Sequence, residues 1–214
     1  MKTARFDPNC RACSRLDQYL AQIRLEYPEY HARPVPPFGA DRPRLLIVGL
    51  APGLHGANAT GRPFTGDHAG ILLYETLYRF GYTDRPVSQA ANDGLQLKNC
   101  RITNAVKCVP PANKPTGSEI TTCNRYLADE LSCLEQGTVI LALGHIAHRA
   151  IIKGYGLKQS DYPFVHGQDR QVPAGQHLLD SYHCSRYNTL TGRLTPEMFR
   201  DIFYKIDQLL SISN

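Results

Sequence analysis

Short apolar runs that alternate with longer helical patterns constrain this chain more than any other feature of its sequence. The apolar runs cover residues 44–50, 101–106, 138–143 and 177–182. The first and third runs are continuous and rich in branched residues, which is typical of parallel strands covered on both faces. Helical patterns cover residues 14–26, 69–80, 117–135, 145–153 and 196–212. This alternation predicts an α/β protein with helices on both sides of a parallel sheet.

Polar, glycine-rich segments follow the ends of three of these predicted strands. They cover residues 51–67, 107–116 and 183–195. Ligand sites in parallel α/β sheets lie outside the carboxyl ends of the strands. We therefore predict one site, at the sheet edge where the three loops meet. A length of 214 residues suits one domain, and we expect residues 1–214 to form it.

The composition restricts the compartment and the partner. No apolar run approaches the length that spans a bilayer, and residues 1–13 lack the apolar core of a signal peptide, so we expect a cytoplasmic protein without membrane contact. The net charge of +5 is compatible with an acidic partner such as nucleic acid, and equally with a mildly basic enzyme. We expect a monomer.

Four of the seven cysteines have a spacing that suits a metal centre. Cys10 and Cys13 form a Cys-x-x-Cys pair, and Cys108 and Cys123 lie far along the chain. Four thiolates suit zinc or a [4Fe–4S] cluster, and the spacing alone leaves both open. The alternative is a set of buried thiols that behave as small apolar residues. A centre that ties the N-terminal segment to mid-chain sulfurs would be structural.

The loop after the first predicted strand is rich in glycine, which lets the backbone approach a ligand closely. It has neither the dinucleotide-binding pattern nor the Lys-Ser/Thr ending of a phosphate-binding P-loop. Its sequence, GLAPG-x-x-GAN-x-TGRPFTGD over residues 49–67, resembles the first motif of the B-type (family 5) uracil-DNA glycosylases. Residues 103–108 (TNAVKC) and 181–195 (SYHCSRYNTLTGRLT) are similar to two further motifs of that family.

The resemblance, which extends from Cys10 to Thr195, implies a three-layer α/β/α fold with a central four-stranded parallel sheet. It also implies a [4Fe–4S] cluster on Cys10, Cys13, Cys108 and Cys123 in preference to zinc. Its activity would be hydrolysis of the N-glycosidic bond of uracil in DNA, and hypoxanthine or xanthine are further possible substrates. The chain departs from the family pattern at Gly53, Cys184 and Tyr187.

The resemblance assigns four side chains to a base-binding pocket. Phe64 would stack on the flipped base, with the backbone at Gly49 and Ala51 beside it. Asn104 offers the acceptor and donors that suit the edge of uracil, and His183 would stabilise charge on the departing base. Asp67 would position the attacking water or offset the positive sugar, but its place before a predicted helix equally suits an N-cap.

The same loops carry four basic residues that we expect to contact DNA phosphates: Arg62, Lys107, Arg186 and Arg193. Tyr187 would enter the gap that the flipped base leaves. Two other functions remain open. One is a non-catalytic iron–sulfur protein that binds damaged or single-stranded DNA, and the other is a zinc-stabilised hydrolase of a small nucleoside.

Overall fold

A computed structural model describes residues 6–212 and contains one six-stranded sheet in the order β1-β3-β2-β4-β6-β5. The central strands β3, β2, β4 and β6 are parallel, as predicted, and the short edge strands β1 and β5 are antiparallel to their neighbours. The strands are β1 (Phe38–Gly39), β2 (Leu45–Gly49), β3 (Cys100–Asn104), β4 (Val139–Leu143), β5 (Asp169–Gln171) and β6 (His177–Ser181).

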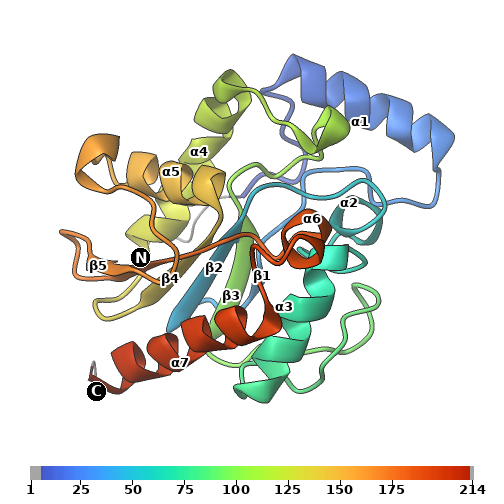
Figure 1. The fold of residues 1–214 in the computed structure, drawn as a ribbon. Helices are drawn as coiled ribbons and strands as arrows, with labels where there is room; N and C mark the ends of the chain where they lie inside the picture. The colour runs from blue at the N-terminus through green and yellow to red at the C-terminus, as the bar shows by residue number, and fades with distance from the viewer. Residues whose placement is uncertain (1–5, 213–214) are drawn as a thin grey trace.

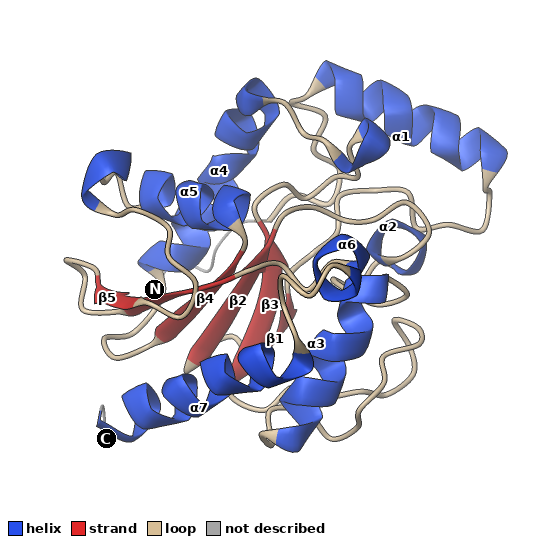
Figure 2. Cartoon of the chain, in the orientation of Figure 1, coloured by secondary structure: helices blue, strands red, loops and turns tan. Residues whose placement is uncertain are grey.

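Helices cover both faces of the sheet, which confirms the three-layer α/β/α arrangement (Figure 1). Figure 2 shows α3 and α7 on the near side of the strands, with α4 and α5 on the other side and α1 at the periphery. The α-helices are α1 (Ser14–Glu26), α2 (Ala57–Thr60), α3 (His68–Arg79), α4 (Gly117–Ser132), α5 (His145–Gly154), α6 (Arg186–Leu190) and α7 (Pro196–Ile212). Two 3-10 turns, η1 (Pro111–Asn113) and η2 (Gln159–Asp161), complete the described elements.

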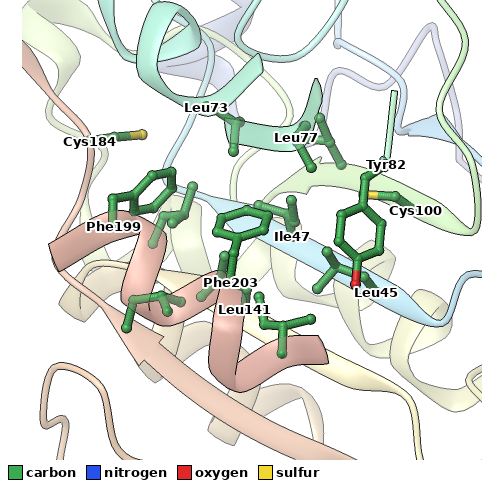
Figure 3. Packing of buried hydrophobic residues seen from close by; sticks show 14 of the residues in the cluster. Leu45, Ile47, Leu73, Leu77, Tyr82, Cys100, Leu141, Cys184, Phe199 and Phe203 are labelled. Carbon is green, nitrogen blue, oxygen red and sulfur yellow. The ribbon is translucent and has the colours of Figure 1, made fainter. Parts of the chain in front are cut away.

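The two cores follow from the alternation of side chains along the strands. In β2, Leu45 and Ile47 face α3 and α7, while Leu46 and Val48 face α4 and α5. Figure 3 shows the first core, in which Phe199 and Phe203 of α7 meet Leu73 and Leu77 of α3 over the sheet. Because both faces are covered, every residue of β2 and β4 is buried, which explains their continuous apolar sequences.

The structure adds two strands to the four that were predicted. β1 has two residues and β5 has three, so neither is long enough to show the alternation by which a strand is recognised. The predicted helices over 14–26 and 196–212 have the observed bounds, and the others differ by one to three residues at their ends. Within residues 6–212, no helix has the length and apolarity needed to cross a membrane.

Candidate active site and cysteine centre

The carboxyl ends of three central strands meet at one edge of the sheet, where the predicted site lies. Gly49 ends β2 and Asn104 ends β3, and these two residues are paired in the register of the sheet. His183 follows the end of β6 by two residues. Side chains that are far apart in the sequence are therefore brought together by the parallel register alone.

Asn104 and Phe64 lie against the backbone of Gly49. A Cβ atom at residue 49 would collide with the Asn104 Oδ1 atom and with the Phe64 ring, so only glycine leaves room for both side chains. Asn104 is 3% exposed, and its Oδ1 atom is buried without a hydrogen-bond partner among the described residues. A buried acceptor left unpaired costs about 1–3 kcal/mol, so this atom is poised to accept a hydrogen bond from a ligand.

Phe64 is held in an unusual backbone conformation. Its φ is +62°, in the left-handed region that bulky residues rarely adopt, and such strain is concentrated at functional sites. The hydroxyl of Tyr74 donates a hydrogen bond of 2.8 Å to the Pro63 carbonyl, and Gly70 lets the Phe64 carbonyl pack against α3. The centroid of its ring lies 6.1 Å from that of the His183 ring at an interplanar angle of 25°, so the two rings are nearly parallel.

His183 is a neutral side chain at physiological pH. Burial lowers the pKa of this imidazole to about 4, well below its ordinary 6.5. Its backbone is fixed by the Asn188 amide, which donates a hydrogen bond of 2.7 Å to the His183 carbonyl, and by Gly144, which packs against its Cβ atom. A neutral imidazole retains one N–H and can donate it to a ligand without carrying a charge.

Asp67 occupies the N-cap position of α3, but its side chain does not cap that helix. Its Oδ2 atom instead accepts a hydrogen bond of 3.1 Å from the backbone N–H of Ala57, at the start of α2. Gly53 and Gly56 form a cradle for the carboxylate, because a Cβ atom at either position would collide with Asp67 Oδ1. Burial raises the pKa of Asp67, and the backbone N–H groups of Ala57 and Gly53 oppose that rise.

Ala51 and Cys184 lie beside the pocket but face other parts of the molecule. The Ala51 side chain packs against the cluster that contains Leu16, Val106 and Cys123, so only its backbone is available to a base. Cys184 is fully buried in the core between α3 and α7, which Figure 3 shows beside Phe199. This thiol fills an apolar space behind the pocket.

Arg62 was expected to contact DNA phosphates, and the structure corrects that expectation. The residue is 4% exposed, and its guanidinium lies 2.8 Å from the carboxylate of Asp93. It also donates hydrogen bonds to the Ser88 hydroxyl and the Ala91 carbonyl and lies over the Phe38 ring. Arg62 therefore joins the first-motif loop to the segment 86–95, and its charge is compensated inside the protein.

Lys107 was also expected at the DNA surface, and it too is internal. It is 1% exposed, and its ammonium lies 2.6 Å from Glu130 of α4 and donates to the Thr103 hydroxyl. Arg101 lies 3.6 Å from the second carboxylate oxygen of Glu130. This buried network fastens the end of β3 to α4, which keeps Asn104 in place. No sequence motif indicates that Lys107 pairs with Glu130, which lies 23 residues away.

Arg186, Tyr187 and Arg193 are exposed beside His183. Tyr187 is 71% exposed on the short helix α6, together with Leu190, and Arg186 begins that helix. The Arg193 guanidinium lies flat over the Tyr182 ring, 4.7 Å from its centroid. An exposed tyrosine and two exposed arginines thus lie close to His183 in the chain.

The four cysteines singled out from the sequence line one pocket, together with Leu16 and Tyr126. The backbone N–H of Lys107 and the Arg125 guanidinium donate hydrogen bonds of 3.3 Å to the sulfurs of Cys123 and Cys10, respectively. Burial raises the pKa of Cys13, Cys108 and Cys123, and the proximity of the other thiols raises the first two further. The fold therefore gathers sulfurs from α4, the N-terminal segment and the loop after β3.

The geometry of this centre bears on what it can hold. In residues 6–212, no three His, Cys, Asp or Glu side chains converge closely enough to bind one metal ion. The four cysteines nevertheless line one shared pocket, and four thiolates suit either zinc or an iron–sulfur cluster. Hydrogen bonds to the sulfurs are a usual feature of iron–sulfur sites.

Some contacts that form the site were not predicted from the sequence. Gly144, which packs against His183, and Gly56, which packs against Asp67, have no motif that assigns them this role. The only sequence signal was the density of glycine in the first-motif loop, which indicates close approaches without saying what approaches.

Comparison with known proteins agrees with this geometry. The family model described as the uracil DNA glycosylase superfamily matches residues 36–207. The chain is 44% identical to a type-5 uracil-DNA glycosylase of Thermus thermophilus, over 95% of this chain and 94% of the relative. It is 40% identical to a type-5 uracil-DNA glycosylase of Pyrobaculum aerophilum, over 91% of this chain and 86% of the relative. It is 33% identical to a type-4 uracil-DNA glycosylase of Archaeoglobus fulgidus, over 77% of this chain and 69% of the relative. The chain therefore belongs to the uracil-DNA glycosylase superfamily, among its type-5 members.

Proposed function

We propose that this protein hydrolyses the N-glycosidic bond between uracil and deoxyribose in DNA and so begins base excision repair. The bond from the sugar to the base nitrogen breaks, water adds to the sugar, and the products are free uracil and an abasic site. The observation that carries the proposal is the buried, unpaired Oδ1 atom of Asn104 beside the rings of Phe64 and His183. Family membership supports the same activity.

Asn104 would select the base. Its Oδ1 atom accepts the N–H that lies between the two carbonyls of uracil, and cytosine has no hydrogen at that ring position. When the wrong base binds, the Asn104 acceptor stays buried without a hydrogen bond. The free energy of removing that acceptor from water is then not offset, so the wrong base binds more weakly. The Phe64 ring stacks on the base face, which contributes about 1–3 kcal/mol without distinguishing one base from another.

His183 and Asp67 would divide the charges that develop as the bond breaks. The sugar becomes positive while the base becomes negative, as in other glycosyl transfers. The neutral imidazole donates its N–H to a base carbonyl, and such preorganised donors stabilise a developing anion. The carboxylate of Asp67 holds the water and offsets the charge of the sugar, and its cradle of backbone N–H groups keeps it oriented.

The cysteine centre would hold a [4Fe–4S] cluster on Cys10, Cys13, Cys108 and Cys123. When bound, the cluster would link the segments that carry its four cysteine ligands, and it would take no part in the hydrolysis. Its ligands join the N-terminal segment to α4 and to the loop that follows Asn104. Arg15 of α1 adds a second tie, because it pairs with Glu119 of α4 at 2.7 Å.

DNA would reach the pocket across the surface of α6. Arg186 and Arg193 contact phosphates there, and Tyr187 enters the stack where the base has left it. The exposure of these three side chains supports the assignment. Each is replaceable without disturbing a buried contact.

The test is single-turnover base release from matched duplexes that carry uracil, hypoxanthine, xanthine or no lesion. We expect release from the uracil duplex, and an absorbance band near 400 nm in the purified protein, an approximate position for thiolate-bound iron–sulfur groups. Tight binding of the uracil duplex without base release would instead identify a non-catalytic damage-binding protein and refute the proposal.

A further inference from the structure

A second, polar pocket lies beside the cysteine centre, between α1, the segment before it and residues 33–34. It has a volume of about 220 Å³, is open to solvent, and its lining includes Arg11, Arg24 and Arg33. Asp17 is the one acidic residue of the lining, and it lies 3.9 Å from Arg11. Apart from Cys10, which belongs to the cysteine centre, the charged side chains of the lining are three arginines and one aspartate, so cations predominate.

Internal contacts fix the segments that carry these arginines. The Arg24 guanidinium donates a hydrogen bond of 2.8 Å to the Ala32 carbonyl, which attaches α1 to the segment that contains Arg33. Arg11 lies between Cys10 and Cys13, so whatever fixes those two sulfurs also fixes the backbone that carries Arg11. Arg11 and Arg33 are exposed residues of the lining.

The pocket is connected to the candidate active site through the backbone. His31 and Ala32 donate backbone hydrogen bonds to the carbonyls of Ala59 and Asn58, at 2.9 and 3.1 Å. Gly61 packs against the His31 ring. The segment before Arg33 is therefore bound to the same loop that presents Phe64 and Asp67.

We propose that this arginine-lined pocket binds a phosphate of the DNA backbone outside the nucleotide that enters the active site. Phosphate is favoured because three guanidinium groups surround a polar, open pocket, and guanidinium forks match phosphate oxygens. The contact would position the duplex without reading sequence. The proposal rests on the proposed function only in naming DNA as the partner.

The experiment measures binding of undamaged duplex by fluorescence anisotropy over a series of salt concentrations. The variants are Arg11→Ala and Arg33→Ala. The matched control is Arg79→Ala, an exposed arginine in the last turn of α3, at the opposite edge of the sheet. We expect the slope of log K against log salt to fall by about 1 in magnitude for each pocket variant and to stay unchanged in the control.

Unchanged salt slopes in both pocket variants would overturn the proposal. An equal reduction of the salt slope in the Arg79→Ala control would overturn it as well. Inorganic phosphate and pyrophosphate are added as competitors at constant ionic strength. We expect either anion to weaken duplex binding by the wild type more than duplex binding by the pocket variants. Phosphate binding that is lost in the pocket variants while their duplex binding stays unchanged would identify a small-anion site and overturn the DNA assignment. Because the duplex is undamaged, failure to release uracil would leave this result unaffected, and the two proposals fail separately.

Discussion

Two sets of buried polar side chains lie within a few residues of each other in this molecule, and they have opposite environments. Lys107 and Arg62 are internal and fully paired, with Glu130 and Asp93, respectively. Asn104 is buried and its acceptor has no partner, whereas His183 is only partly buried and no described residue bonds to its ring. The first pair holds loops in place, and the second pair is left for a ligand.

Lys107 is a buried cation that is compensated inside the protein, whereas Asn104 Oδ1 is a buried acceptor that is not. Glu130 Oε2, in the structural network, also lacks a hydrogen-bond partner, so an unpaired atom points to binding only where it also lies at the proposed site. Buried polar groups in proteins are nearly always paired, so an unpaired one is an exception with a cause. All four residues lie in loops or strand ends that the motifs single out, and motif position alone does not separate the two classes. The predictions below test the separation.

Asp67→Asn should have the largest effect, lowering base release by orders of magnitude while binding of uracil-containing DNA persists. That pattern marks an interaction made mainly in the transition state. Burial raises the pKa of Asp67 above its ordinary 3.8, which means that the folded state disfavours the ionised carboxylate. At neutral pH the charge on Asp67 therefore lowers the free energy of unfolding. We therefore expect the variant to be more stable at pH 7, with the gain disappearing below about pH 3.8.

Thermal unfolding and single-turnover rates on the same Asp67→Asn preparation measure both effects. A helix-cap role predicts the reverse result, a stability loss of about 1 kcal/mol with normal turnover. A variant that is less stable but fully active would therefore remove Asp67 from the catalytic set.

Lys107→Met should destabilise the protein by up to about 3–5 kcal/mol, because it leaves the buried Glu130 carboxylate with only the Arg101 guanidinium, 3.6 Å away, as a cationic partner. The double variant Lys107→Met with Glu130→Leu should recover much of that loss, since it removes both charges. Denaturant unfolding of the two variants and the wild type gives the comparison. A direct phosphate contact by Lys107 predicts instead a reduced salt slope with little loss of stability.

Gly53→Ala should lower base release by about 100-fold, because a Cβ atom at this position displaces the Asp67 carboxylate and small misplacements are costly in catalysis. Gly117→Ala is the matched control, since a Cβ atom there meets no other atom within 4 Å. Rates for both variants are compared under single-turnover conditions. Equal rates in the two variants would show that the glycine cradle does not position Asp67.

Asn104→Ala should reduce uracil release by about 10- to 100-fold, which corresponds to about 1–3 kcal/mol for a lost buried hydrogen bond. It should affect a purine lesion less, and it should not destabilise the free protein, because the deleted acceptor has no partner there. Ratios of release rates for uracil and hypoxanthine, with melting temperatures, measure these effects. A large loss of stability would place Asn104 in the paired, structural class.

The smallest expected effect is that of pH on base release near 6.5. The rate should show no inflection there, because His183 is already neutral. Since its pKa in the folded state is about 4, the unfolded chain takes up a proton first as the pH falls. As the pH falls from 6.5 to about 4, protonation of His183 in the unfolded chain therefore lowers the free energy of unfolding. Activity should decline on the acid side as Asp67 protonates, above pH 3.8. A pH profile with an inflection near 6.5 would indicate a histidine that titrates during the reaction.

The sequence predicted the layers and the edge at which the site lies, because both follow from local patterns. The apolar runs that became β2 and β4 are buried on both faces, and such runs specify parallel central strands without knowledge of their partners. The edge strands β1 and β5 escaped notice because they are held by pairing with neighbours and not by their own composition.

The sequence by itself therefore determined the α/β architecture, the grouping of Asn104, Asp67 and His183 at one edge, and the cysteine spacing. Only the tertiary structure decided what each polar side chain meets. Asp67 turned from the helix that it precedes to the backbone of α2, and Arg62 and Lys107 turned inward to carboxylates 31 and 23 residues away. Local sequence fixes the position of a residue along the backbone, but the charge that compensates it comes from packing between distant segments, which no short motif records.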